Sequence, residues 1–154
     1  GSVSGTVKNY NSAADKVTVQ LIQQGYSEPA YETIVPSGTK VGNQYTASYS
    51  ISGIASGTYT MRVMKNNHVT REYTVTVSGD AKTQNAEIWL LGDVNGDGRV
   101  NAMDCTRLLM HVNRSQLLTD AYALKCADVN RDSRLNAMDC TRLLTHVNKT
   151  QPLW

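Results

Sequence analysis

The chain has 154 residues, with 15 Lys and Arg residues against 13 Asp and Glu and a formal net charge of +2. This near balance excludes the strong basic excess of a nucleic-acid-binding protein, and no apolar run is long enough to predict membrane insertion. The Cys residues number three and lack the spacing of a zinc site, so we expect neither a disulfide framework nor bound zinc.

Apolar side chains alternate with polar ones in several short runs before residue 91, as in Val17-Thr18-Val19 and Tyr59-Thr60-Met61. This period of two predicts half-buried antiparallel strands, and the Gly, Ser and Asn residues between the runs are typical of turns. The sequence therefore predicts an all-β antiparallel sandwich over residues 1–91. We expect about seven strands, at residues 3–8, 16–23, 31–35, 44–52, 58–64, 69–77 and 83–90.

Two stretches of this half resemble a known group of modules. The opening Val3-Ser4-Gly5-Thr6-Val7 and the segment 53–63, which contains a Gly-Thr-Tyr step from a turn into a strand, are similar to carboxypeptidase-regulatory-like, CnaB-like or transthyretin-like sandwiches. The resemblance implies an Ig-like sandwich that acts as a spacer or stabiliser beside another module. It implies no catalytic activity.

A duplicated acidic loop dominates the rest of the chain. The loops read DVNGDGRVNAMD at 93–104 and DVNRDSRLNAMD at 128–139, and the longer copies 93–114 and 128–149 agree at 17 of 22 positions. Oxygen-bearing side chains fall at loop positions 1, 3, 5, 9 and 12, which is the ligand pattern of a calcium-binding loop, and position 7 offers its backbone carbonyl. We expect two Ca²⁺ ions, held by Asp93, Asn95, Asp97, Arg99, Asn101 and Asp104 and by Asp128, Asn130, Asp132, Arg134, Asn136 and Asp139.

The second loop lacks both glycines of the first. Gly96 and Gly98 are replaced by Arg131 and Ser133. The loop must turn sharply at its sixth position, and a non-glycine residue with a positive φ there costs roughly 1–2 kcal/mol. We expect the second loop still to bind Ca²⁺, but more weakly than the first.

Each loop leads into an apolar stripe with helical spacing. Cys105, Leu108 and Val112 follow the first loop, and their counterparts follow the second. Spacings of three and four place them on one helix face, which we expect to pack in a core. A short helix over 119–126, with Thr119 as its N-cap, is predicted between the copies. We therefore expect residues 92–154 to form a small all-α unit of two EF-hand-like loop–helix units and a linking helix.

Three features of this unit resemble the dockerin family. No helix precedes the first loop, position 12 is Asp rather than Glu, and the loop–helix units recur after 35 residues. The resemblance covers Gly92–Trp154. It implies a non-catalytic, calcium-dependent module that docks its parent protein onto a cohesin of a scaffold protein in a cellulosome-type assembly. It also implies a monomer that binds cohesin 1:1, an extracellular or cell-surface location, and possible attachment to a carbohydrate-active enzyme in a longer protein.

In the dockerin family, cohesin contacts come from loop positions 10 and 11 and from the helix that follows. Because Met103, Arg107 and Met110 share one side of that helix, the spacing supports this placement. The near-symmetry of the copies predicts that either helix can bind, with Met110 against Thr145 as the main difference. The expected contacts are Ala102, Met103, Arg107, Leu109, Met110 and Arg114, and Ala137, Met138, Arg142, Leu144, Thr145 and Lys149.

Two other functions stay open at this point. A calcium-responsive switch could expose a Met-rich groove, although the first loop has no incoming helix. The tyrosines of the sandwich could bind carbohydrate, although most of them occupy inward positions of the alternating pattern. For the C-terminus we expect Leu153 and Trp154 to close over residues 89–91 or over the sandwich.

Overall fold

The computed structural model describes residues 1–154, which form two compact units, Gly1–Ile88 and Trp89–Trp154. The sequence had suggested a boundary after Leu91. None of the helices combines the length and the apolar character needed to cross a membrane.

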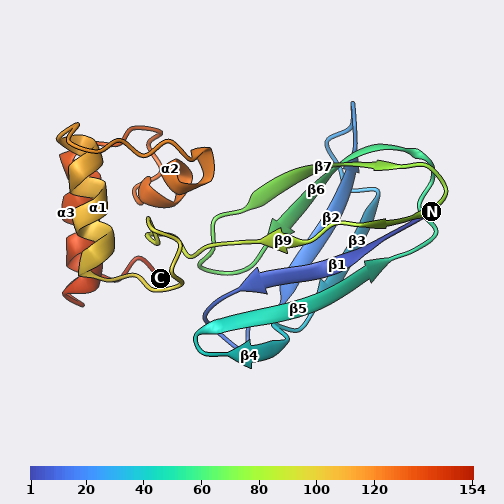
Figure 1. Ribbon diagram of the computed structural model, residues 1–154, viewed down its shortest axis with the longest axis horizontal. Helices are drawn as coiled ribbons and strands as arrows, with labels where there is room; N and C mark the ends of the chain where they lie inside the picture. The colour runs from blue at the N-terminus through green and yellow to red at the C-terminus, as the bar shows by residue number, and fades with distance from the viewer. The chain divides into compact units, whose positions relative to one another are not determined.

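The first unit is a β-sandwich of two sheets (Figure 1). One sheet has the strand order β4-β5-β1-β8, with β9 also paired to β1, and the other has the order β3-β2-β6-β7. The strands are β1 (Ser2–Asn9), β2 (Val17–Gln23), β3 (Tyr31–Val35), β4 (Thr39–Val41), β5 (Gln44–Ile51), β6 (Gly57–Met64), β7 (Arg71–Val77), β8 (Ala81–Thr83) and β9 (Ala86–Glu87).

The predicted sandwich is confirmed, but its last strand was predicted wrongly. Instead of one strand over 83–90, the chain forms β8 and β9, which both pair in parallel with β1. Between them the side chain of Asn85 accepts a hydrogen bond from the backbone N–H of Thr6 at 3.0 Å, so a side chain interrupts the ladder. Strand β4 was missed because its three residues are all exposed and show no alternation.

The core of the sandwich consists of the inward residues of the alternating runs. In β2, Val17, Val19 and Leu21 are fully buried, as the period of two predicted. Most tyrosines of this unit are buried or half-buried, and Tyr26 alone is largely exposed. The sandwich therefore has no flat strip of exposed aromatic rings, and carbohydrate binding gains no support.

A buried polar cluster closes one end of this core. The Lys65 ammonium donates to Asn9 Oδ1 at 2.8 Å, and the Tyr10 N–H donates to His68 Nε2 at 3.0 Å. Burial lowers the pKa of Lys65 to about 8 and that of His68 to about 4. The cluster joins the end of β1 to the turn after β6, where the sequence Lys65-Asn66-Asn67 predicted only a turn.

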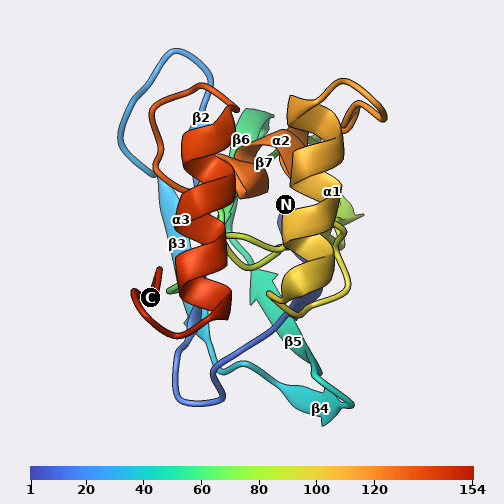
Figure 2. The ribbon, with the colours of Figure 1, turned by 90° about the vertical axis from the view of Figure 1, so that its left-hand side faces the viewer.

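The second unit contains the helices α1 (Ala102–Val112), α2 (Ala121–Ala127) and α3 (Ala137–Val147). Helices α1 and α3 lie side by side and run in opposite directions (Figure 2). Leu108 and Leu143 are fully buried, as the helical stripes predicted. The N-cap of α2 is Asp120, whose carboxylate accepts from the Tyr122 N–H at 2.8 Å, rather than Thr119.

Candidate metal loops and helix face

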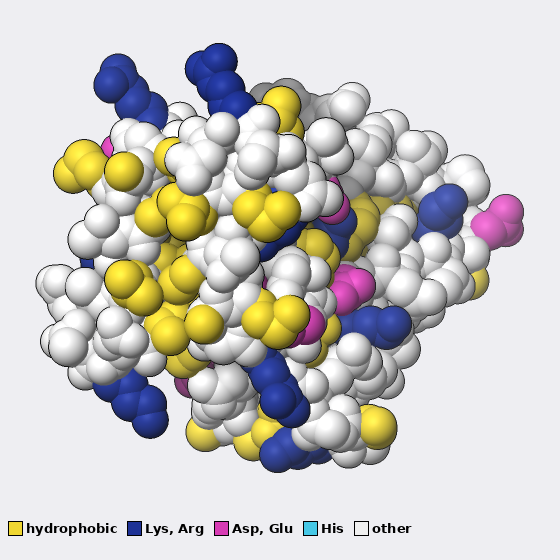
Figure 3. Space-filling view, turned by 60° about the vertical axis from the view of Figure 1, so that its left-hand side comes forward, with side chains coloured by type: hydrophobic (Ala, Val, Ile, Leu, Met, Phe, Trp, Pro, Cys, Tyr) yellow, Lys and Arg dark blue, Asp and Glu magenta, His cyan; other side chains and the backbone are white.

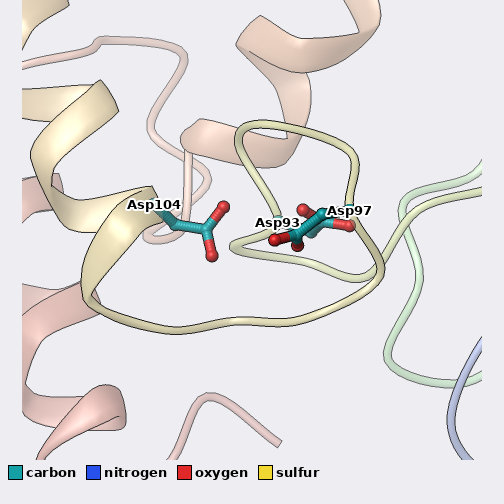
Figure 4. A group of neighbouring side chains, drawn as sticks. All are labelled: Asp93, Asp97 and Asp104. Atoms are coloured by element: carbon teal, nitrogen blue, oxygen red, sulfur yellow. The ribbon is translucent and has the colours of Figure 1, made fainter. Parts of the chain in front are cut away.

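The first loop brings three carboxylates together. Asp93, Asp97 and Asp104 each offer an oxygen, and these oxygens lie within 4.8 Å of one another. Asp104 extends from the first turn of α1 toward the loop that carries the other two (Figure 4). Since Ca²⁺–oxygen distances are about 2.3–2.6 Å, ligands on opposite sides of one ion stand about 5 Å apart. The spacing of the three carboxylates fits such an ion.

Backbone amides hold these carboxylates in place. The two Asp93 oxygens accept from the N–H groups of Gly96 and Gly98 at 2.9 and 2.8 Å. The Asp104 oxygens accept from Val94 at 2.8 Å and from Asn101 at 2.9 Å. The second of these bonds completes a capping box at the start of α1. The loop and the helix start are thus one hydrogen-bonded structure.

Crowding and burial disfavour negative charge in this loop. Asp93 and Asp104 are both fully buried. Burial raises the pKa of Asp93 to about 7, and the neighbouring carboxylates of Asp104 and Asp97 add to the rise, although the Gly98 N–H opposes it. Burial also raises the pKa of Asp104. A bound divalent cation would reverse this preference because it stabilises the ionised form.

The second loop repeats this geometry with less burial. Carboxylate oxygens of Asp128, Asp132 and Asp139 also lie within 4.8 Å of one another, but only Asp139 is buried. Its residues at positions 4 and 6, Arg131 and Ser133, have φ values of 57° and 66°. The positive φ expected at Ser133 is therefore present, and Arg131 also has a positive φ although it is not a glycine.

The asparagines among the predicted ligands have further roles in the structure. Asn101 and Asn136 are the N-caps of α1 and α3, and their side chains accept from the N–H groups of Met103 and Met138. Each also lies at position 9 of its loop. The exposed Asn95 and Asn130 lie at position 3, and the exposed Arg99 and Arg134 at position 7.

The predicted contact residues lie on the outer surfaces of α1 and α3. Met103 is 64% exposed and Met138 is 67% exposed, although both are apolar. Figure 3 shows hydrophobic side chains gathered on one face, with Lys and Arg at its edges. Ala102, Leu109, Arg114, Ala137, Leu144 and Lys149 are also exposed, whereas Arg107, Met110, Arg142 and Thr145 are half-buried.

Each helix carries a groove, and a third groove runs between them. The α1 groove is lined by Ala102, Met103 and Met110 among others, and the α3 groove by the equivalent Ala137, Met138 and Thr145. The groove between the helices is lined by Cys105, Thr106, Leu109, Cys140, Thr141 and Leu144. Cys105 and Cys140 are only half-buried. The expectation that they pack in the core was therefore wrong; they face the seam between two antiparallel helices.

Arg107 and Arg142, both predicted contact residues, make internal hydrogen bonds. The guanidinium groups of Arg107 and Arg142 each donate to two backbone carbonyls in the segment that follows their own helix. The sequence pattern could not reveal this because both residues share a helix side with the exposed methionines. They therefore have a structural role in addition to any role at an interface.

The C-terminus closes over the start of this unit, as expected. The indole N–H of Trp154 donates to the Leu91 carbonyl at 3.1 Å, and its ring lies 4.9 Å from that of His146. Gly92 has a φ of 95°, and a Cβ there would stand 3.2 Å from the Leu153 side chain. Glycine at this position allows both the turn and the close approach of the tail.

Residues 91–148 match the family model of the dockerin type I domain. The match covers both acidic loops and all three helices, and we call Trp89–Trp154 the dockerin unit. It does not extend to the β-sandwich, whose resemblance to carboxypeptidase-regulatory-like modules stays a prediction. No curated protein matches the chain.

The solved structures that are similar to the chain include two of a type II cohesin–X-dockerin complex from Acetivibrio cellulolyticus. Each is 21% identical, with 94% of both chains covered. One is an N-terminal interface mutant with a TM-score of 0.39, and the other is a C-terminal interface mutant with a TM-score of 0.35.

Proposed function

We propose that the dockerin unit is a calcium-dependent, non-catalytic module that attaches its parent protein to a cohesin of a scaffold protein outside the cell. The observation that carries the proposal is the duplicated acidic loop, which leads in both copies into a helix with an exposed methionine. The match to the dockerin type I domain over residues 91–148 supports it. The β-sandwich would act as a spacer beside this module.

Calcium has a structural role in this proposal. Each loop would hold one ion through the carboxylates at positions 1, 5 and 12, with Asn95 or Asn130, the carbonyl of residue 99 or 134, and Asn101 or Asn136 completing the oxygen ligands. The ion would neutralise the crowded carboxylates. Because Asp104 and Asp139 also close the capping boxes of α1 and α3, the energy of ion binding would stabilise both helix starts.

The helix face would make the contact with cohesin. Exposed methionines bordered by Arg and Lys match the apolar centre and polar rim of a protein interface. The two grooves on α1 and α3 are related by the duplication, so either one can face a cohesin. We expect one cohesin to occupy one groove at a time, giving a 1:1 complex.

Calorimetric titration of the full chain with a panel of recombinant cohesin modules tests the proposal. We expect at least one cohesin to bind 1:1 in calcium and to lose binding when a chelator is present. Binding that is unaffected by the chelator would contradict the role of calcium. Failure of every cohesin to bind the calcium-loaded chain would contradict the role in docking.

A further inference from the structure

The duplication extends beyond the end of each helix. After Arg114, with a φ of 59°, and Lys149, with a φ of 60°, the chain turns back along the helix that it has just left. The N–H of Gln116 donates to the Met110 carbonyl at 3.1 Å, and the N–H of Gln151 donates to the Thr145 carbonyl at 3.2 Å. We call the segments 116–118 and 151–153 the return segments. Gln and Leu occupy the same first and third positions in both.

An Arg–His pair one helical turn apart fixes each return segment. Arg107 donates to the carbonyls of Gln116 and Leu117 at 2.7 and 2.9 Å, and His111 Nδ1 accepts from the Leu118 N–H at 2.9 Å. In the second copy, Arg142 donates to the carbonyls of Gln151 and Pro152. There His146 Nδ1 accepts from the Leu153 N–H at 2.8 Å.

Hydrogen bonds therefore fix the backbone at the middle residue of each return segment, whereas the side chain of that residue is exposed. Leu117 is 55% exposed although it is apolar, and its backbone is fixed on both sides. The segment is bonded to Met110, and Met110 and Arg107 both line the α1 groove. An apolar side chain on a backbone that is already ordered loses little conformational entropy on binding, which suits an interface anchor.

The two copies differ at this position. Leu117 corresponds to Pro152, and Met110 corresponds to Thr145, so the α1 side carries larger apolar side chains at both positions. Arg114 and Lys149 are exposed beside the two faces and keep both of them cationic. The complementary surface on a cohesin would be an apolar depression bordered by carboxylates.

We infer that Leu117, held in place by Arg107 and His111, is a specificity-determining anchor of the α1 face and directs cohesin to α1 in preference to α3. This inference rests on the proposed docking function. Leu117 lies outside both the calcium loop and the helix. Its side chain gives the nearly symmetric module a preferred orientation on cohesin.

The test compares Leu117→Gln with the matched variant Pro152→Gln in the full chain with calcium. For the cohesin that binds the unmodified chain most tightly, we expect Leu117→Gln to weaken binding about tenfold. Pro152→Gln should change it by no more than about twofold, as for an ordinary surface position. Thermal unfolding in calcium checks that each variant is folded. Equal effects of the two variants would overturn the inference.

A gain of binding gives an independent test. In a chain that carries Met103→Asp to disable the α1 face, we expect Pro152→Leu to strengthen cohesin binding at least about threefold because it gives α3 the missing anchor. No gain from Pro152→Leu would contradict the inference even if Leu117→Gln unfolds. If the unmodified chain binds no cohesin, the docking function itself fails, and this outcome is distinct from both of the others.

Discussion

The two loop–helix copies of the dockerin unit have almost the same sequence but different environments. Asp93 and Asp104 of the first loop are fully buried, and Gly96 and Gly98 make its turns. In the second loop only Asp139 of the three clustered carboxylates is buried, and non-glycine residues make both turns. The comparison shows that the same ligand residue types can lie in different surroundings, so we expect the two loops to differ in calcium affinity. Burial and backbone strain around the ligands must also be known.

The largest difference is expected when the last ligand of each loop is removed. Asp104→Ala should abolish the first calcium site and the capping box of α1. Asp139→Ala should abolish the second calcium site and the capping box of α3. At free calcium a thousandfold above the dissociation constant, a lost site removes about 4 kcal/mol of stability. We expect the larger loss from Asp104→Ala because the tighter site is lost. Calorimetric calcium titration and thermal unfolding measure both effects, and a larger loss from Asp139→Ala would reverse the proposed order of the sites.

A smaller effect is expected when a charge is placed on either helix face. Met103→Asp should weaken cohesin binding by about 2 kcal/mol at an interface anchor, and Met138→Asp should weaken it less because α3 is the poorer face. With Met103→Asp and Met110→Asp together, binding through α3 should persist, and adding Met138→Asp should abolish it. Binding measurements on a surface that carries one cohesin show which substitution weakens binding more. Complete loss from the first pair would show that α3 cannot bind alone.

The smallest effect is expected at position 6 of the loops. Ser133→Gly should stabilise the second loop by about 1 kcal/mol since it relieves a positive φ. The matched exchange Gly98→Ser should destabilise the first loop by a similar amount. Calcium affinity of each variant, measured by competition with a chromophoric chelator, checks the two signs. If both exchanges act in the same direction, backbone strain does not distinguish the loops.

Much of the metal geometry could be predicted because it depends on spacing along the chain. The 12-residue loop places Asp93, Asp97 and Asp104 near one another whatever surrounds it. In the structure, one carboxylate oxygen from each of them lies within 4.8 Å of the others. The buried Leu108 and Leu143 likewise follow from helical spacing. These features are local, so a pattern within one short segment contains enough information.

The features that were missed depend on contacts between distant segments. Parallel pairing of β8 and β9 with β1 joins residues about eighty apart in the sequence, and no local alternation indicates it. The buried Lys65 contacts Asn9, which the Lys-Asn-Asn turn sequence gave no reason to expect. Arg107 shares a helix side with Met103, yet it bonds to a return segment whose path depends on the turn after α1. Leu117 lies on the surface only because the return segment follows this path after α1.

We propose that the dockerin unit folds only with bound calcium, and amide-resolved NMR of the full chain before and after chelation tests this proposal. We expect chelation to collapse the dispersed signals of Trp89–Trp154, because crowded carboxylates then lack a cation, while the signals of Gly1–Ile88 stay in place because that unit has its own apolar core. Adding calcium should restore the lost signals. Unchanged spectra on chelation, or loss of signals across both units, would contradict the claim.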